Sequence, residues 1–362
     1  MRFEVTSVLD AIERHLTTEA TLAQVAVDIG EIAWFEALDG GRPVNLLRTG
    51  LLVDALSRHF GEEAIRLYPV AGRDLLTDAD LTSKERMVLG RWSSDGLIEV
   101  VPNAHERVLE VSDLTGMPIA VCHDLQGAEQ RYPWVRGDRV LRLGPGDGGA
   151  QIHGGHPAPV QAPGPGAGLL GRSWRCQRRE CPIFGERRAV AQAVPHIRSG
   201  VPSCPRHGEP LGDLGPRPPA VAVALAVDGV VRERFVLYAG RPVVVGRAPD
   251  HPAGIVIGNF MTGEDLQMIS RNHLEFELRD EVVLVSDIST NGTVIRSRSS
   301  AYGPAEEVHL ASGPPYPLKP WDTVEPHDRV VLGRADRMPT GHGGHGGSVM
   351  GDAPTISLGP PM

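Results

Sequence analysis

The feature that most constrains the fold is a series of short β-type runs within residues 221–334. Turn residues such as glycine, proline, asparagine and aspartate separate these runs, which cover residues 234–238, 242–245, 254–257, 273–278, 282–286 and 293–296. Many short strands without intervening helices favour an antiparallel β-sandwich. A run over residues 328–333, delayed by a long insertion, is expected to close it.

Three polar loop motifs lie between these runs. Gly246-Arg247 follows the run PVVV, the string SRNH (residues 270–273) precedes LEFEL, and DISTNGT (residues 287–293) follows VVLVS. Arginine suits bidentate phosphate binding, and a hydroxyl beside it can donate to the same oxygens. An Asn-Gly pair makes a tight turn that can present an amide to a peptide backbone. The motifs therefore predict loops that bind a phosphorylated peptide.

The three motifs together resemble the signature of the forkhead-associated (FHA) family. That signature combines a Gly-Arg pair, a Ser-x-x-His string and an Asn-Gly turn, spaced much as they are here. The resemblance covers residues 220–335. It implies an eleven-stranded β-sandwich whose loops at one end bind phosphothreonine.

The resemblance also assigns roles to residues. It implies that Arg247 and Ser270 hold the phosphate, and Arg271 lies where the family often places another polar residue facing it. Thr290 would line the pocket, and Asn291 would bond the peptide backbone. Three further residues are expected to support the loops without touching ligand: Gly246, His273 and Gly292.

A second candidate site lies in residues 172–212. The pattern is C-x4-C, 22 intervening residues and C-x2-H, formed by Cys176, Cys181, Cys204 and His207. Paired ligands on tight turns suit tetrahedral zinc, and a complete four-ligand set is structural rather than catalytic. The pattern predicts a small zinc-binding module that resembles a zinc ribbon and takes its folding energy from the metal. His196 is the alternative fourth ligand, and unconnected thiols are the alternative to a metal site.

The N-terminal part, residues 1–125, shows helical periodicity. Apolar residues recur at helical spacing over residues 8–16, 51–60 and 81–92. Thr82 or Ser83 is the expected cap of the third helix, with Glu85 in its first turn. Two strand-like runs follow, residues 97–101 and 107–111. This order predicts a mainly α, winged-helix-like α+β domain, which we interpret as a protein-interaction module.

Low-complexity segments separate the folded parts. Residues 144–168 are rich in glycine and proline and predict a mobile linker, and residues 338–362 predict a disordered tail. The chain is therefore expected to be multidomain, with folded parts at residues 1–125, 172–212 and 220–335.

The charge distribution bears on the partner. Residues 1–125 hold 11 Lys/Arg against 21 Asp/Glu, so this part lacks the basic face of a DNA-binding domain. Residues 172–207, in contrast, hold eight arginines against two glutamates. The leading hypothesis is an adaptor in Ser/Thr kinase signalling that binds phosphothreonine-containing proteins. The alternative is a regulator of transcription or nucleic-acid processing that binds nucleic acid through the basic zinc segment or the winged-helix-like region.

Other sequence features bear on location and activity. The sequence has no apolar run of membrane length and no signal-peptide pattern, so we expect a cytoplasmic protein without a membrane partner. We find no phosphate loop, nucleophile elbow or metal-base helix motif, so we do not expect an enzyme. Lys84 and Lys319 are the only lysines, and this arginine bias is typical of a high-GC bacterium.

Overall fold

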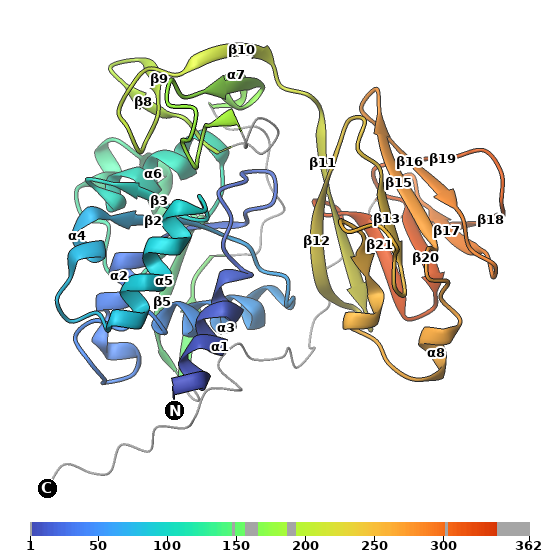
Figure 1. Cartoon of the computed structure of the whole chain (residues 1–362), viewed down its shortest axis with the longest axis horizontal. Coiled ribbons are helices and arrows are strands. Elements are labelled where there is room, and N and C mark those ends of the chain that lie inside the picture. Colours follow the sequence, from blue (N-terminus) through green and yellow to red (C-terminus); the bar gives the residue numbers. More distant parts are fainter. Residues whose placement is uncertain (1, 147–148, 156–165, 187–192, 301–302, 339–362) are drawn as a thin grey trace, which may run out of the picture. The chain divides into compact units, whose positions relative to one another are not determined.

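The computed structural model describes residues 2–146, 149–155, 166–186, 193–300 and 303–338. These residues divide into two compact units (Figure 1). The first runs from residue 2 to 60 and from 65 to 215, and the second contains Gly61–Ala64 and residues 216–338. No helix among the described residues is both long and apolar enough to cross a membrane.

The first unit is built on a six-stranded sheet with the strand order β3-β2-β1-β4-β5-β6. Its strands are β1 (Val25–Asp28), β2 (Leu67–Gly72), β3 (Glu99–Val101), β4 (Ile119–Val121), β5 (Val140–Gly146) and β6 (Gly149–His153). Neighbours pair in parallel except at the antiparallel β5–β6 edge. The first four strands are buried throughout, as expected of a parallel sheet that is covered on both faces.

Helices cover both faces of this sheet. One face packs against α1 (Arg2–Glu13), α2 (Ile29–Trp34), α3 (Arg48–Phe60) and α5 (Ser83–Ser94), with the short α4 (Arg73–Thr77) between β2 and α5. The other face packs against α6 (Ala104–Thr115). Side chains of a strand alternate between faces. Val25 and Val27 of β1 therefore join the first core, and Ala26 joins the second.

The winged-helix-like prediction for the N-terminal part is wrong. The three predicted helices do form, as α1, α3 and α5, and Thr82 caps α5 in a capping box with Glu85. However, the second predicted wing strand, residues 107–111, lies inside α6. The Asn103 side chain accepts a hydrogen bond from the Glu106 amide and begins a helix where we expected a turn. The first predicted wing strand is β3, which pairs in parallel with β2.

The predicted linker is also wrong at its N-terminal end. Residues 144–146 complete β5, and residues 149–153 form β6 at the edge of the sheet. Ala150 is buried and Ile152 packs against the core of the first face, so this glycine-rich segment does bury apolar side chains. The centre of the predicted linker, residues 156–165, and the predicted tail from residue 339 on lie outside the described residues.

The Cys/His segment belongs to the first unit. It follows α7 (Ala167–Leu170) and contains two small ribbons. In one ribbon β7 (Arg172–Arg175) pairs with β10 (Gly212–Pro216), and in the other β8 (His196–Arg198) pairs with β9 (Val201–Ser203).

The second unit is an all-β sandwich, as predicted. Its sheets have the orders β12-β11-β21-β20-β17-β18 and β14-β13-β15-β16-β19, which make eleven strands in the described residues. The bounds are β11 (Ala220–Val227), β12 (Val230–Tyr238), β13 (Val243–Gly246), β14 (Ile255–Val256), β15 (Leu274–Arg279), β16 (Val282–Asp287), β17 (Thr293–Ser297), β18 (Glu306–Leu310), β19 (Tyr316–Leu318), β20 (Thr323–His327) and β21 (Val330–Arg334). The short α8 (Glu264–Gln267) lies between β14 and β15.

The core of the sandwich follows from alternation along the strands. Leu274, Phe276 and Leu278 of β15 are buried, while the residues between them are less so. They share one core with apolar residues of the six-stranded sheet, such as Leu225 and Leu332. The two sheets therefore pack face to face, which leaves the loops at each end free for other roles.

Candidate functional site

The three loop motifs meet at one end of the sandwich, where β13 and β16 end and β15 and β17 begin. The Arg247 amide donates to the carbonyl of Ser270 at 2.9 Å. The Thr290 amide donates to the hydroxyl oxygen of Ser270 at 3.1 Å. The fold therefore places Arg247, Ser270 and Thr290 around one point, although 43 positions separate the first from the last.

Two glycines make this approach possible. A Cβ atom on Gly246 would lie 2.1 Å from the backbone oxygen of Arg271, so no side chain fits between the first two loops. Gly292 has φ of +82°, in the left-handed region that favours glycine, and it turns the third loop into β17.

The side chains of Ser270 and Arg247 can still donate to a ligand. The Ser270 oxygen accepts the Thr290 amide, so its own proton is free for another acceptor. The half-buried Arg247 uses Nη1 to donate to the Gln267 side chain at 2.7 Å. Its Nε is buried without a partner among the described residues. A guanidinium has five N–H donors, so most of the capacity of Arg247 remains available.

Arg271 and Asn291 lie in the same loops but have other contacts. The exposed Arg271 forms an ion pair with Asp250. The exposed Asn291 donates from Nδ2 to the Met268 carbonyl at 2.7 Å. Of the five residues predicted to contact ligand, the structure thus joins Arg247, Ser270 and Thr290 directly through loop hydrogen bonds.

His273 lies behind the loops and is fully buried. Its Nδ1 accepts the Ser270 amide at 3.0 Å, which leaves Nε2 to donate to the Gly292 carbonyl at 3.3 Å. Burial lowers the pKa of His273, so the ring is held neutral in this tautomer. The ring connects the second and third loops without reaching the surface.

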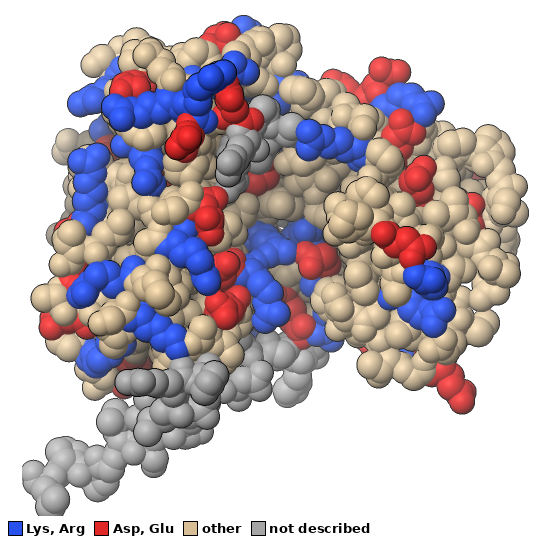
Figure 2. Space-filling model, in the orientation of Figure 1, with Lys and Arg blue, Asp and Glu red and all other residues tan. Residues whose placement is uncertain are grey.

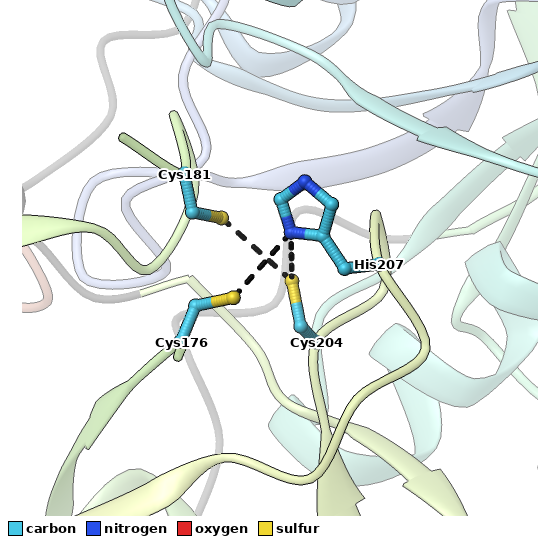
Figure 3. Close-up of side chains that lie close together, drawn as sticks. All are labelled: Cys176, Cys181, Cys204 and His207. Atoms are coloured by element: carbon cyan, nitrogen blue, oxygen red, sulfur yellow. Dashed lines mark hydrogen bonds between the residues drawn. The ribbon is translucent and has the colours of Figure 1, made fainter. Parts of the chain in front are cut away.

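The Cys/His pattern forms a compact cluster (Figure 3). The ligand atoms of Cys176, Cys181, Cys204 and His207 all lie within 4.8 Å of one another. His207 Nδ1 is 3.4 Å from the sulfurs of Cys176 and Cys204, and the sulfurs of Cys181 and Cys204 are 3.7 Å apart. Tetrahedral zinc bonds imply sulfur–sulfur separations of about 3.8 Å and sulfur–nitrogen separations of about 3.6 Å. The donor set and its dimensions therefore fit a tetrahedral metal.

The surroundings of the cluster also suit a metal. The three cysteines are buried, and the Phe184 amide donates to the Cys181 sulfur at 3.3 Å. Amide donors of this kind orient and stabilise thiolate ligands. His196, the alternative fourth ligand, lies elsewhere: its Nδ1 contacts Glu110 Oε2 at 2.6 Å.

Residues 194–197, which lead into and include the start of β8, bond to side chains of the α/β fold. The Val194 amide donates to the Tyr68 hydroxyl at 3.0 Å, and the Ile197 amide donates to Glu110. Arg107 donates to the carbonyls of Val194 and Pro195. Residues between the Cys176–Cys181 turn and the Cys204–His207 turn therefore complete the core on the α6 face of the sheet.

Half of the six described arginines of the Cys/His segment, residues 172–186 and 193–207, are paired with acids. Ion pairs join Arg172 to Asp213, Arg178 to Glu209 and Arg179 to Glu186. On the face drawn in Figure 2, basic and acidic side chains are interspersed. The free positive charge is therefore smaller than the arginine count suggests.

Sequence reasoning missed the residues at the carboxyl ends of β1 and β4. Asp28 ends β1, and the Glu31 carboxylate accepts hydrogen bonds from the amides of Cys122 and His123 after β4. Burial raises the pKa of Asp28 to about 6. From β1 the chain adds β2 and β3 on one side of the sheet, and from β4 it adds β5 and β6 on the other side. Open parallel sheets bind ligands at such a switch point, beyond the carboxyl ends of the two central strands. The available signal was an acidic residue directly after a short apolar run.

Comparison with known proteins agrees with the fold of the second unit. Residues 243–324 match the family model described as FHA domain. A comparison with curated proteins gave no match.

Solved structures of FHA domains are similar to about a third of the chain. The MEK1 FHA domain is 24% identical, with 32% of this chain and 86% of that chain covered and a TM-score of 0.24. The FHA domain of human APLF, solved in complex with an XRCC1 bisphospho peptide, is 19% identical (31% and 97% covered, TM-score 0.24). The FHA domain of CT664 from Chlamydia trachomatis is 21% identical (32% and 94% covered, TM-score 0.21).

Proposed function

Because the second unit contains a forkhead-associated (FHA) domain, we propose that this chain binds phosphothreonine-containing segments of partner proteins. In this proposal it is an adaptor in signalling by a Ser/Thr kinase, whose phosphorylated substrates are its partners. The FHA loops supply the binding site, and the first unit contributes contacts to other proteins.

The observation that carries the proposal is the meeting of Arg247 and Ser270. A phosphothreonine brings roughly −1.5 to −2 charges and three acceptor oxygens. The Arg247 guanidinium can offer a planar, two-pronged contact, and the Ser270 proton is free to donate beside it. His273 and Gly246 hold these loops without occupying the space in front of them.

We also propose that the Cys176, Cys181, Cys204 and His207 cluster holds one structural zinc ion. Three thiols and an imidazole complete a tetrahedral site and leave no position for water or substrate. In this role zinc joins the two turns of the module and stabilises its small apolar core, which includes Ile183, Phe184 and Leu211.

The test of phosphopeptide binding uses the full-length protein and matched peptides that carry phosphothreonine, phosphoserine or unmodified threonine. We expect binding of the phosphothreonine peptides, weaker binding of phosphoserine and no binding of the unmodified form. Loss of a charge-assisted hydrogen bond costs roughly 1.5–3 kcal/mol, so Arg247→Ala should weaken binding by about tenfold or more.

Arg279→Ala is the matched control. This arginine ends β15 at the opposite end of the strand from Ser270, and its exposed side chain pairs with Glu277. The control should bind as the wild type does. Equal binding of phosphorylated and unmodified peptides, or equal effects of the two substitutions, would contradict the proposal.

A further inference from the structure

The short helix α8 lies in the connection between the Gly-Arg motif and the SRNH motif. Residues 258–268 of this connection are fixed to the sandwich at two places. Met261 is buried and Leu266 packs against the same apolar core. Asp265 accepts a hydrogen bond at 2.7 Å from Nη1 of Arg329, which lies in the turn before β21. The connection can therefore support other side chains.

Two groups of this connection bond side chains that are expected to contact the phosphopeptide. The exposed Gln267 ends α8, and its Oε1 accepts a hydrogen bond from Arg247 Nη1 at 2.7 Å. The next residue, Met268, uses its backbone carbonyl to accept a hydrogen bond from Asn291 Nδ2 at 2.7 Å. The connection therefore contacts both the arginine expected at the phosphate and the asparagine expected at the peptide backbone.

The bond to Gln267 orients the Arg247 guanidinium and leaves most of its donors for a ligand. A guanidinium has five N–H donors. In Arg247 the Nε donor is buried and Gln267 takes one donor of Nη1, which leaves three on the two terminal nitrogens. Ordering a long side chain when a ligand binds costs affinity, and a side chain that is already held avoids this cost. An amide oxygen has no net charge, so it competes with phosphate less than a carboxylate would.

We propose that Gln267 is a positioning residue for phosphothreonine binding, because it holds the Arg247 guanidinium in place before the phosphopeptide binds. The inference rests on the proposed function, and it gives α8 a role that the three loop motifs do not include. Met268 orients Asn291 in the same way, since donation from Nδ2 leaves Oδ1 available to accept from the peptide backbone. A segment outside the three motifs thus preorganises the binding loops.

The experiment measures, by titration calorimetry, the affinity of full-length variants for the phosphothreonine peptide that the wild type binds best. Gln267→Met keeps the length of the side chain but removes the acceptor, so affinity should fall about threefold or more, as for one hydrogen bond. Gln267→Glu adds a charge that pairs with Arg247 and repels phosphate, so affinity should fall about tenfold or more. Glu264→Gln, at an exposed position that begins the same helix, is the control and should bind within about twofold of the wild type.

A double-mutant cycle separates positioning of Arg247 from general support of the fold. In an Arg247→Ala background, Gln267→Met should change the affinity by less than about twofold, because the side chain through which Gln267 acts is absent. An equal loss in both backgrounds would overturn this inference alone, and so would a Gln267→Met variant that binds as well as the wild type or better. Failure of the wild type to bind any phosphothreonine peptide would overturn the proposed function as well.

Discussion

Arg107 and Glu99 form an ion pair in which the two side chains are only 2% and 0% exposed. Arg107 Nε donates to Glu99 Oε2 at 2.7 Å, and Nη2 donates to Oε1 at 3.0 Å. The other donors reach Glu110 and the carbonyls of Val194 and Pro195. All five N–H groups of the guanidinium are therefore satisfied in the interior, which is the condition for a buried charge to be tolerated.

The first prediction concerns this pair. Arg107→Met should lower the free energy of unfolding of the first unit by about 3–5 kcal/mol, because it leaves the Glu99 carboxylate buried without its partner. Arg131→Met is the control, since Arg131 is 69% exposed and its pair with Glu106 lies at the surface. The control should change stability by less than about 0.5 kcal/mol. Chemical unfolding, monitored by circular dichroism, measures the free energy of unfolding of both variants. An equal loss of stability in the two would contradict the prediction.

The second prediction concerns pH. Burial raises the pKa of Glu110, but the hydrogen bond from His196 and the charge of Arg107 outweigh it and bring the pKa to about 2, below the ordinary 4.5. The unfolded chain therefore binds more protons between these values. Glu110 contributes its full stability above about pH 4.5 and loses it as pH falls toward 2, by about 3 kcal/mol in total.

Glu110→Gln should remove this part of the pH dependence and lower stability at neutral pH. Glu106→Gln serves as the control, because Glu106 is on the same helix and is 39% exposed. Thermal unfolding from pH 2.5 to 7 measures how the stability of the wild type and of each variant depends on pH. An unchanged slope below pH 4.5 in Glu110→Gln would show that another group is responsible.

The third prediction concerns the metal. Elemental analysis of the purified protein should find one zinc per chain, and Cys204→Ser should lose it while Cys122→Ser retains it. Cys122 lies after β4 and is not among the four clustered ligands. Chelation should also lower the melting temperature of the α/β fold, since the module supplies the carbonyls that bind Arg107. Zinc-free protein with unchanged melting would contradict both parts.

The fourth prediction separates charge from geometry at the phosphate site. Arg247→Lys should restore part of the phosphopeptide affinity that Arg247→Ala loses, because an ammonium keeps the charge but cannot make the planar two-pronged contact. Ser270→Ala removes a phosphate donor and also the acceptor of the Thr290 amide. It should weaken binding by about fivefold or more. Titration calorimetry distinguishes these outcomes, and full rescue by lysine would exclude bidentate binding.

The second unit could be predicted from sequence because its signals are local. Alternation along residues 273–278 and 282–286 indicates half-buried strands, and the motifs around Arg247, Ser270 and Asn291 come directly before or after strands. Strands β18 to β20 were missed. Residues 297–317 contain two glycines and four prolines and were interpreted as an insertion, and no strand was predicted over residues 318–327.

The fold of the first unit was harder to predict from the sequence, and the reason is physical. Strands buried on both faces, such as β1 and β4, are short apolar runs without alternation, and periodicity alone does not distinguish them from pieces of helix. The run at residues 107–111 contains β-branched residues, but Asn103 caps a helix there and packing against the sheet decides the outcome. The contact between Arg107 and Val194 joins positions 87 residues apart, and no local sequence pattern predicts such a contact.

The position of residues 193–198 has a consequence for how this chain can be divided or recombined. Turns bearing Cys181 and Cys204 flank this segment, and the segment satisfies side chains of β2 and α6. A fragment that stops after β6 would lack residues 193–198, so Tyr68, Arg107 and Glu110 would lose the hydrogen bonds that they make to this segment. The α/β fold and the Cys/His module should therefore be transferred to another protein as one piece that ends near residue 215.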